Sequence, residues 1–197
     1  GMQYGSGVKV VGTQKAFTTG SMQVTNQKMD VAITGQGFFQ VERPDSTVGY
    51  TRSGNLQVNS EGVITTAQGL PIIPQIELPV NTKELSIAKD GTVSVTVGAE
   101  TDPVELGQIT LVNFVNPAGL SAVGGNLYLE TAASGAPVEG VPGEEAFGQL
   151  EQGTLEGSNV QVVEEMVDMI TVQRAYEMNA KMVSAADDML KFITQTL

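Results

Sequence analysis

The 197-residue sequence contains no cysteine, no histidine and no tryptophan. Without cysteine there are no disulfides, thiol nucleophiles or thiolate zinc ligands, and without histidine the usual general base and metal ligand is missing. Carboxylates, lysine, hydroxyl groups and tyrosine are the side chains left for chemistry. We therefore expect no cofactor and no metal site.

Basic residues are also scarce, with 10 Lys+Arg against 22 Asp+Glu and a formal net charge of -12. A phosphate backbone or an anionic membrane surface is a poor partner for such a chain, since no basic patch is visible. No apolar run approaches the ~20 residues that span a bilayer, and the pattern of a signal peptide is missing. We expect no nucleic-acid partner, no membrane insertion and, for work outside the cytoplasm, export without a cleaved signal peptide.

Glycine and proline are missing from the last 40 residues, although 23 glycines and eight prolines occur at or before Gly157. This boundary separates a glycine-rich part from a segment without helix breakers. We expect an extended or partly ordered segment over 1–29, an all-β domain over 30–148, a linker over 149–159 and a helix over 160–197. The predicted fold is mainly β, with a barrel- or sandwich-like central domain.

Short β-prone runs separated by turn residues are typical of the glycine-rich part. Strands are predicted at 30–33 and 38–41, and hairpins around the turns "NSEG" (59–62) and Asp90-Gly91. The run 107–115 is apolar at most positions, which favours one central, buried strand. The segment 131–148 is small, polar and rich in Pro and Gly, so it is expected to be a loop.

The C-terminal segment has the spacing of a capping box, with Ser158 as a possible N-cap and Gln161 three residues later. A helix of this length is far longer than the ~11–12 residues of an average globular helix. Its apolar residues recur at heptad spacing on a broadened stripe, which favours a coiled-coil or bundle seam. The stripe includes Val162, Met166, Met169, Tyr176, Val183, Leu190 and Ile193.

Adjacent acids are the one catalytic constellation that the composition allows: Glu144-Glu145, Glu164-Glu165 and Asp187-Asp188. A glycosidase needs two carboxyl groups facing each other at ~5–9.5 Å, whereas neighbours in sequence point apart. Solvated surface acids are the preferred interpretation. Gly35-Gln36-Gly37 lacks the Lys-Ser/Thr and the helix of a phosphate loop, and is interpreted as a tight turn or bulge. No catalytic residue is predicted.

Two segments closely resemble the signatures of the bacterial flagellar axial proteins of the rod and hook. They are "LEGSNVQVVEEMVDMITVQRAYEMNAKMVSAADDMLKFITQ" (155–195) and "DVAITGQGFFQV" with "YTRSGNLQVNSEGVITTAQGLPI" (30–41 and 50–72). The run 112–137 is most similar to the distal-rod branch of this family. The residues that carry the internal motif are Gly35, Gly37, Phe38, Phe39, Arg52, Gly54, Asn55, Gly62 and Gly69.

This resemblance implies a non-enzymatic subunit of the basal-body distal rod, which assembles into a helical tube and transmits torque. It implies a homo-oligomer, with other rod and hook proteins and the surrounding L- and P-ring proteins as partners, in the periplasm-spanning rod. The family's N-terminal helix, which pairs with the C-terminal one, would precede Met2. A proximal rod or hook protein is the alternative within the family, and a secreted carbohydrate-binding or carbohydrate-acting β protein is the alternative outside it.

Overall fold

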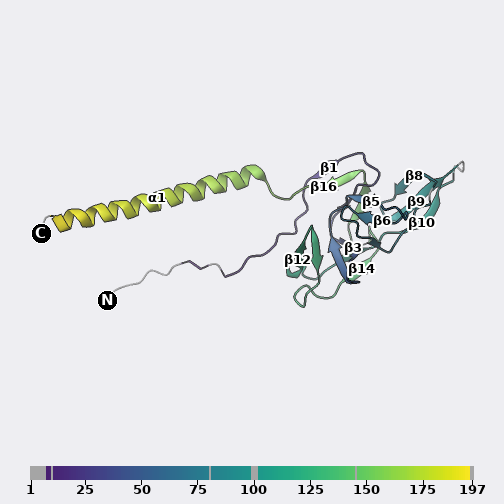
Figure 1. The fold of residues 1–197 in the computed structure, drawn as a ribbon, viewed down its shortest axis with the longest axis horizontal. Helices are drawn as coiled ribbons and strands as arrows, with labels where there is room; N and C mark the ends of the chain where they lie inside the picture. Colours follow the sequence, from purple (N-terminus) through teal and green to yellow (C-terminus); the bar gives the residue numbers. More distant parts are fainter. Residues whose placement is uncertain (1–7, 10, 80, 99–101, 145, 196–197) are drawn as a thin grey trace. The chain divides into compact units, whose positions relative to one another are not determined.

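The computed structural model describes residues 8–9, 11–79, 81–98, 102–144 and 146–195. The chain forms two compact units, Gly1–Gly157 and Ser158–Leu197. The first, here called the β unit, is built from short strands, and the second is one long helix (Figure 1). This confirms the predicted mainly β fold with a long C-terminal helix, and no barrel closes among the described residues.

The described residues of the β unit form sixteen strands and one short 3-10 helix. The first eight strands are β1 (Met22–Val24), β2 (Val31–Thr34), β3 (Phe38–Glu42), β4 (Val48–Thr51), β5 (Leu56–Val58), β6 (Ile64–Thr66), β7 (Ile72–Ile73) and β8 (Thr82–Ile87). They are followed by β9 (Thr92–Val97), β10 (Val104–Gln108), β11 (Leu111–Asn113), η1 (Pro117–Gly119), β12 (Ser121–Gly124), β13 (Leu127–Leu129), β14 (Val138–Gly140), β15 (Gln149–Gln152) and β16 (Thr154–Glu156). The second unit is α1 (Val162–Gln195).

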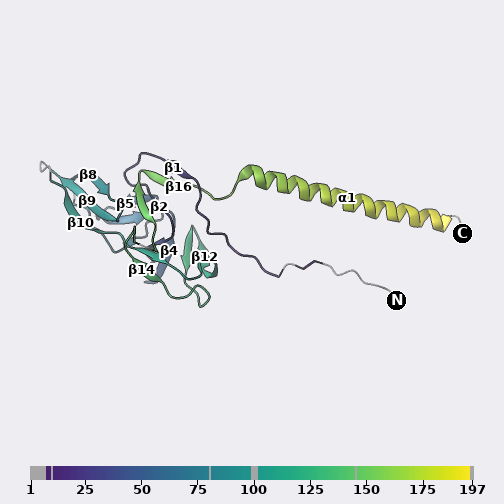
Figure 2. The ribbon, with the colours of Figure 1, turned by 180° about the vertical axis from the view of Figure 1, so that it is seen from behind.

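The strands pair antiparallel in five sheets. The largest has the order β12-β13-β4-β3-β11-β14, with β7 also paired to β3, and a three-stranded sheet has the order β10-β9-β8. The other three are the pairs β5-β6, β2-β15 and β1-β16. The last two pairs join strands from opposite ends of the unit, so its first and last segments lie side by side (Figures 1 and 2).

One main core holds the β unit together. It joins residues of β2, β3 and β11 to residues of β8 and β9, and its fully buried members include Ile33, Phe39, Val93, Leu111 and Leu150. A second, aromatic cluster forms around Phe38, Tyr50 and Phe114. Phe38 and Phe39 enter the two different clusters because successive residues of a strand point to opposite faces. The largest sheet is therefore packed on both sides.

Several local predictions are confirmed. The predicted strands at 30–33 and 38–41 match β2 and β3, and the turns at 59–62 and Asp90-Gly91 join β5 to β6 and β8 to β9. The prediction of one strand over 107–115 is wrong: β10 ends at Gln108 on the edge of the three-stranded sheet, and β11 starts at Leu111 in the largest sheet. Ile109 lies between them, 1% exposed, with its N–H donating to the Gly91 carbonyl. A continuous apolar run cannot reveal such a change of sheet, because Ile109 between the strands and Leu111 in β11 bury their side chains in the same core.

Structure extends beyond the limits that the sequence predicts for the β domain. Residues 149–156, predicted as part of a linker, form β15 and β16, with Leu150 and Thr154 buried. Within the predicted loop 131–148, β14 pairs with β11. Within the predicted extended segment 1–29, β1 pairs with β16. These strands are short, and their partners lie more than 20 residues away, so local composition does not show the pairing.

Helix α1 begins at Val162, two residues after the predicted start at Val160. The Glu165 N–H donates to the Gln161 carbonyl, which is the first helical hydrogen bond, while the Ser158 hydroxyl oxygen accepts from the Val160 N–H. Ser158 therefore forms a local turn before the helix instead of capping it. None of the described helices has the combination of length and hydropathy that would let it span a membrane.

Candidate functional site

The predicted motif residues of the β unit fall into two groups. Gly62 and Gly69 lie in the turns that follow β5 and β6. The others surround β2: the β2–β3 turn holds Gly35 and Gly37, β3 begins with Phe38 and Phe39, and the β4–β5 connection holds Arg52, Gly54 and Asn55. The structure thus brings residues 35–39 and 52–55 together in one site.

Arg52 is the centre of this site. Its guanidinium donates to the carbonyl oxygens of Ile33, Gly35 and Gly37 at 3.1–3.4 Å, and it lies 6.0 Å from the centre of the Phe38 ring. It also forms an ion pair with Glu156 at 2.9 Å, through both Nε and Nη2. The two side chains are only 18% and 11% exposed. One cation therefore fixes the β2–β3 turn and the end of β16 at the same time.

Glu156 extends this site to the N-terminal segment. Its Oε1 accepts from the Gly20 N–H at 3.0 Å, and its backbone pairs with Met22 in the β1–β16 ladder. The next residue, Gly157, donates its N–H to the Ser21 carbonyl. We call Arg52, Glu156 and this backbone pairing the exit junction, because the chain enters and leaves the β unit here. The sequence analysis did not identify Glu156 as a site residue. The available signal was Arg52 in the internal motif, a cation for which no acidic partner was predicted.

The glycines around β2 allow the close backbone packing that the site needs. A Cβ on Gly54 would overlap the Val31 carbonyl oxygen, since these two segments run against each other. Gly35 and Gly37 have φ of 127° and 137°, where side chains are strained. Both conformations aim carbonyl oxygens at Arg52. This explains why three glycines occur beside one arginine.

The N-terminal segment is also fixed by an aromatic contact. Phe17 lies edge-on to Phe38 and Tyr128, with ring centres 5.7 and 5.3 Å apart. Lys15 donates to the Leu120 carbonyl and lies 5.5 Å from the centre of the Tyr128 ring. Deeper in the cluster, burial raises the pKa of Tyr50, with Glu130 and Glu139 adding to the effect. Phe17 thus covers the aromatic cluster of the largest sheet.

We expect Phe17→Ala to free the segment before β1 without unfolding the β unit. The substitution removes two edge-to-face pairs, worth roughly 1–3 kcal/mol together. Amide hydrogen exchange over 11–21 should accelerate, while exchange in β3 and β11 stays slow. Val11→Ala is the control, because Val11 is 95% exposed and should leave exchange unchanged. Equal protection of residues 11–21 in both variants would contradict the assignment.

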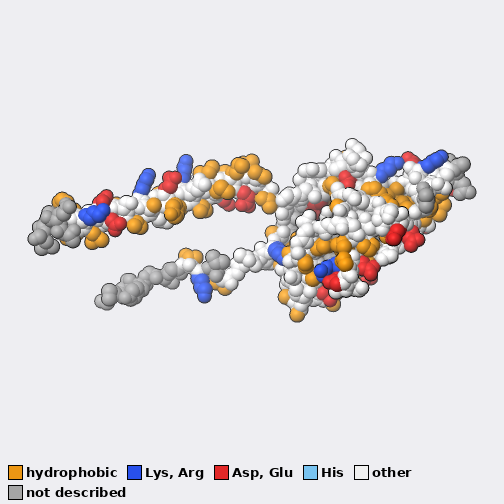
Figure 3. Space-filling view, viewed as in Figure 1, with side chains coloured by type: hydrophobic (Ala, Val, Ile, Leu, Met, Phe, Trp, Pro, Cys, Tyr) orange, Lys and Arg blue, Asp and Glu red, His pale blue; other side chains and the backbone are white. Residues whose placement is uncertain are grey.

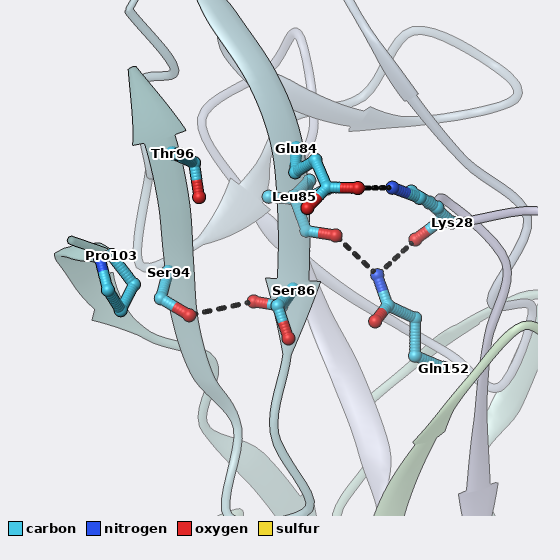
Figure 4. Close-up of a pocket in the computed structure, with 8 residues that line it drawn as sticks. All are labelled: Lys28, Glu84, Leu85, Ser86, Ser94, Thr96, Pro103 and Gln152. Carbon is cyan, nitrogen blue, oxygen red and sulfur yellow. Dashed lines mark hydrogen bonds and ion pairs between the residues drawn. The ribbon is translucent and has the colours of Figure 1, made fainter. Parts of the chain in front are cut away.

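A second polar cluster lies where β15 meets the three-stranded sheet, beside a recess of about 250 Å³ (Figure 4). The Gln152 amide donates to the carbonyls of Lys28 and Leu85, and its oxygen accepts from the Ile87 N–H. Lys28 pairs with Glu84 at 2.9 Å on the exposed rim. Figure 4 shows the Gln152 amide between the carbonyls of Lys28 and Leu85, and the Lys28 ammonium group facing Glu84. These contacts hold β15 against the three-stranded sheet, which is a structural role.

The predicted acid pairs do not form an active site among the described residues. Glu164, Glu165, Asp187 and Asp188 are all exposed on α1, and Glu145 lies outside the described residues. Within the described part of the chain no group of three or more acidic side chains could hold a metal ion. What the β unit offers instead is a set of fixed backbone junctions.

Helix α1 is exposed from Val162 to Ile193, and hydrophobic side chains lie on its surface along this length (Figure 3). The seven predicted stripe residues are between 55% and 75% exposed: Val162, Met166, Met169, Tyr176, Val183, Leu190 and Ile193. A helix of 34 residues is about 51 Å long at ~1.5 Å per residue. Large apolar patches rimmed by polar residues mark interaction surfaces. The chemistry that α1 offers is therefore association through apolar surface.

Comparison with known proteins gives matches at both ends of the chain. The family model described as "Flagellar basal body rod FlgEFG protein C-terminal" matches residues 151–196. The model described as "Flagellar hook protein FlgE/F/G D1 domain" matches residues 32–95. The first match includes Glu156 and α1, and the second includes Arg52 and its glycines.

Several similar proteins are flagellar basal-body rod proteins called FlgG. The one from Buchnera aphidicola subsp. Acyrthosiphon pisum is 49% identical over 195 residues, which cover 99% of this chain and 75% of the relative. The one from Borreliella burgdorferi is 47% identical, covering 96% and 72%. The one from Agrobacterium fabrum is 42% identical, covering 100% and 75%. On these matches, the chain belongs to the FlgG family of flagellar basal-body rod proteins.

Proposed function

We propose that the protein is a structural subunit of the distal rod of the flagellar basal body and that it works by self-association. The observation that carries this is α1, whose large apolar side chains are exposed from Val162 to Ile193 in a member of the rod family. Burial of such side chains stabilises an assembly by roughly 25 cal/mol per Å² of apolar surface, less the cost of ordering. The function needs no catalytic group.

In the assembled state the subunits form a homo-oligomeric helical tube. Rod and hook proteins lie at its ends, and the L- and P-ring proteins surround it. The tube carries torque from motor to hook, and its subunits leave the cell without a cleaved signal peptide. A fixed exit junction supports this role, because a load on the ends of the β unit needs a stiff point of attachment. Family membership does not favour the carbohydrate-binding alternative.

We expect Val183→Asp to weaken self-association of the chain at least about tenfold, because a carboxylate replaces a side chain worth roughly 1.5–3 kcal/mol when buried. Sedimentation velocity over a concentration series measures the effect. The matched control is Ser184→Asp, which adds the same charge at the neighbouring position on another side of α1 and should leave association unchanged. Equal losses in both variants would overturn the proposed role of the α1 stripe in self-association.

A further inference from the structure

Two anchors hold the segment before β1 on the surface of the β unit. Figures 1 and 2 show this segment passing β12 on its way to β1. The first anchor is the ring of Phe17, which lies edge-on to Tyr128 and its neighbour in the aromatic cluster. The second is the N–H of Gly20, which donates to the Glu156 carboxylate. We call residues 11–21, which carry both anchors, the N-terminal strap.

Arg52 contacts the partners of both anchors. Its guanidinium lies 6.0 Å from the centre of the Phe38 ring, and the ring centre of Phe17 lies 5.7 Å from the same ring. Arg52 also donates to one oxygen of Glu156 at 2.9 Å, while the other oxygen accepts from the Gly20 N–H at 3.0 Å. One side chain therefore positions both the surface on which Phe17 packs and the acceptor of Gly20.

A short piece of chain also joins the two anchors. Phe17 and Gly20 are three residues apart, which spans at most ~10–11 Å. While one anchor is closed, the other stays near its partner, and its effective concentration there is high. When one anchor is lost, the other dissociates more readily. We therefore expect both anchors to leave the surface together.

The packing around Phe17 lets its ring leave without disturbing the core. Phe17 is half-buried and borders a recess of about 180 Å³, which Phe114 and Pro117 also line. The aromatic residues beneath it belong to the sheet itself, and Phe38 is only 2% exposed. Release of the strap therefore removes a cover and leaves the buried residues of the cluster in place.

We propose that the N-terminal strap is a latch, which opens and closes as one unit while the rest of the β unit stays folded. Opening releases both anchors and leaves the Arg52–Glu156 ion pair in place. The chain then leaves the β unit at Met22 instead of Lys15, which adds up to ~23 Å of free chain. The latch thus sets the length of free chain in front of β1, a property that does not depend on self-association.

Chymotrypsin tests the latch in the full chain, because the protease must take the Phe17 ring into its own hydrophobic specificity pocket. Glu156→Gln removes the charge that pairs with Arg52. We expect cleavage after Phe17 to become about tenfold faster, since cleavage follows the population of the open form. Mass spectrometry of the digest identifies the cut. The matched control is Glu151→Gln, which removes the same charge from an exposed position on β15 and should leave the rate unchanged.

Coupling between the anchors has to act in both directions. The strap ends at Ser21, whose carbonyl accepts from the Gly157 N–H at 2.8 Å, so this amide is released with the strap. Phe17→Ala should accelerate hydrogen exchange of the Gly157 N–H about tenfold, as measured by NMR. Phe147→Ala is the matched control: Phe147 is also half-buried, but it packs against the main core and should leave this exchange unchanged.

Several results would overturn the latch. Unchanged cleavage after Phe17 in Glu156→Gln, or unchanged Gly157 exchange in Phe17→Ala, would mean that the anchors are independent. Cleavage after Phe17 that appears only together with cleavage after the fully buried Phe39 would mean that the whole β unit opens. Equal acceleration in Glu151→Gln would mean that net charge, and not the Glu156 contact, controls the strap. The proposed function stands in all of these cases, because none of them measures self-association.

Discussion

Replacing Arg52 by methionine is expected to destabilise the β unit by roughly 3 kcal/mol, since breaking a buried ion pair by removing one partner costs about 3–5 kcal/mol. The lower part of the range applies because Arg52 and Glu156 keep 18% and 11% exposure. The substitution leaves the Glu156 carboxylate without its cation and three carbonyl oxygens without their donor. Urea unfolding followed by tyrosine fluorescence measures the loss.

A matched control for this experiment is Arg43→Met. Arg43 also pairs with a carboxylate, that of Asp45 at 3.1 Å, but this pair lies in an exposed turn where ion pairs contribute little. The double variant Arg52→Met/Glu156→Met should lose less than the sum of the single losses, because no uncompensated charge remains. If Arg52→Met unfolds at the same urea concentration as the unchanged protein, the exit junction is not what holds the turn to β16.

The second large effect is expected for Gly54→Ala. A methyl group there would overlap the Val31 carbonyl oxygen, and Val31 is fully buried on β2, so the backbone has no room to retreat. We expect a loss above about 4 kcal/mol, which is most of the stability of an ordinary domain. Circular dichroism and limited proteolysis should then report a β unit that is largely unfolded.

Gly69→Ala is the control for this second experiment because Gly69 belongs to the same family motif. Its φ of 81° makes alanine strained, but no atom lies within 4 Å of the added methyl group. The expected cost is only the strain of a left-handed alanine, about 1–2 kcal/mol. Comparable losses in the two variants would show that the close approach of Gly54 to the Val31 carbonyl does not decide the stability of the β unit.

How much the sequence predicts depends on whether the signal is local. The β5–β6 and β8–β9 hairpins and α1 follow from turn residues and periodicity within a single stretch, and the structure has them where expected. The pairs β1-β16 and β2-β15 join residues more than 100 positions apart, and the sequence of one strand does not indicate which strand it pairs with. Strand pairing of that kind is set by the packed core, not by local preference.

The same distinction applies to the site. The family motif identifies Gly35, Gly37, Arg52 and Gly54. It does not show what these residues do, because the ion-pair partner of Arg52 is Glu156, which lies 104 residues later in the chain. On α1 the spacing alone predicts an apolar stripe.

The β1–β16 ladder has a mechanical consequence. Its rungs run from Met22–Glu156 to Val24–Thr154, and both free ends of the chain leave from the Met22–Glu156 end. A force that separates those ends would unzip the ladder one rung at a time, which is the weakest way to load a pair of strands. Glu156 lies at the end of the ladder where the two strands would begin to separate, and its two carboxylate oxygens accept from Gly20 and Arg52. Only the hydrogen bond from the Gly157 N–H to the Ser21 carbonyl precedes this rung among the described β1–β16 contacts, so the ladder itself begins to open at the rung that an ion pair holds.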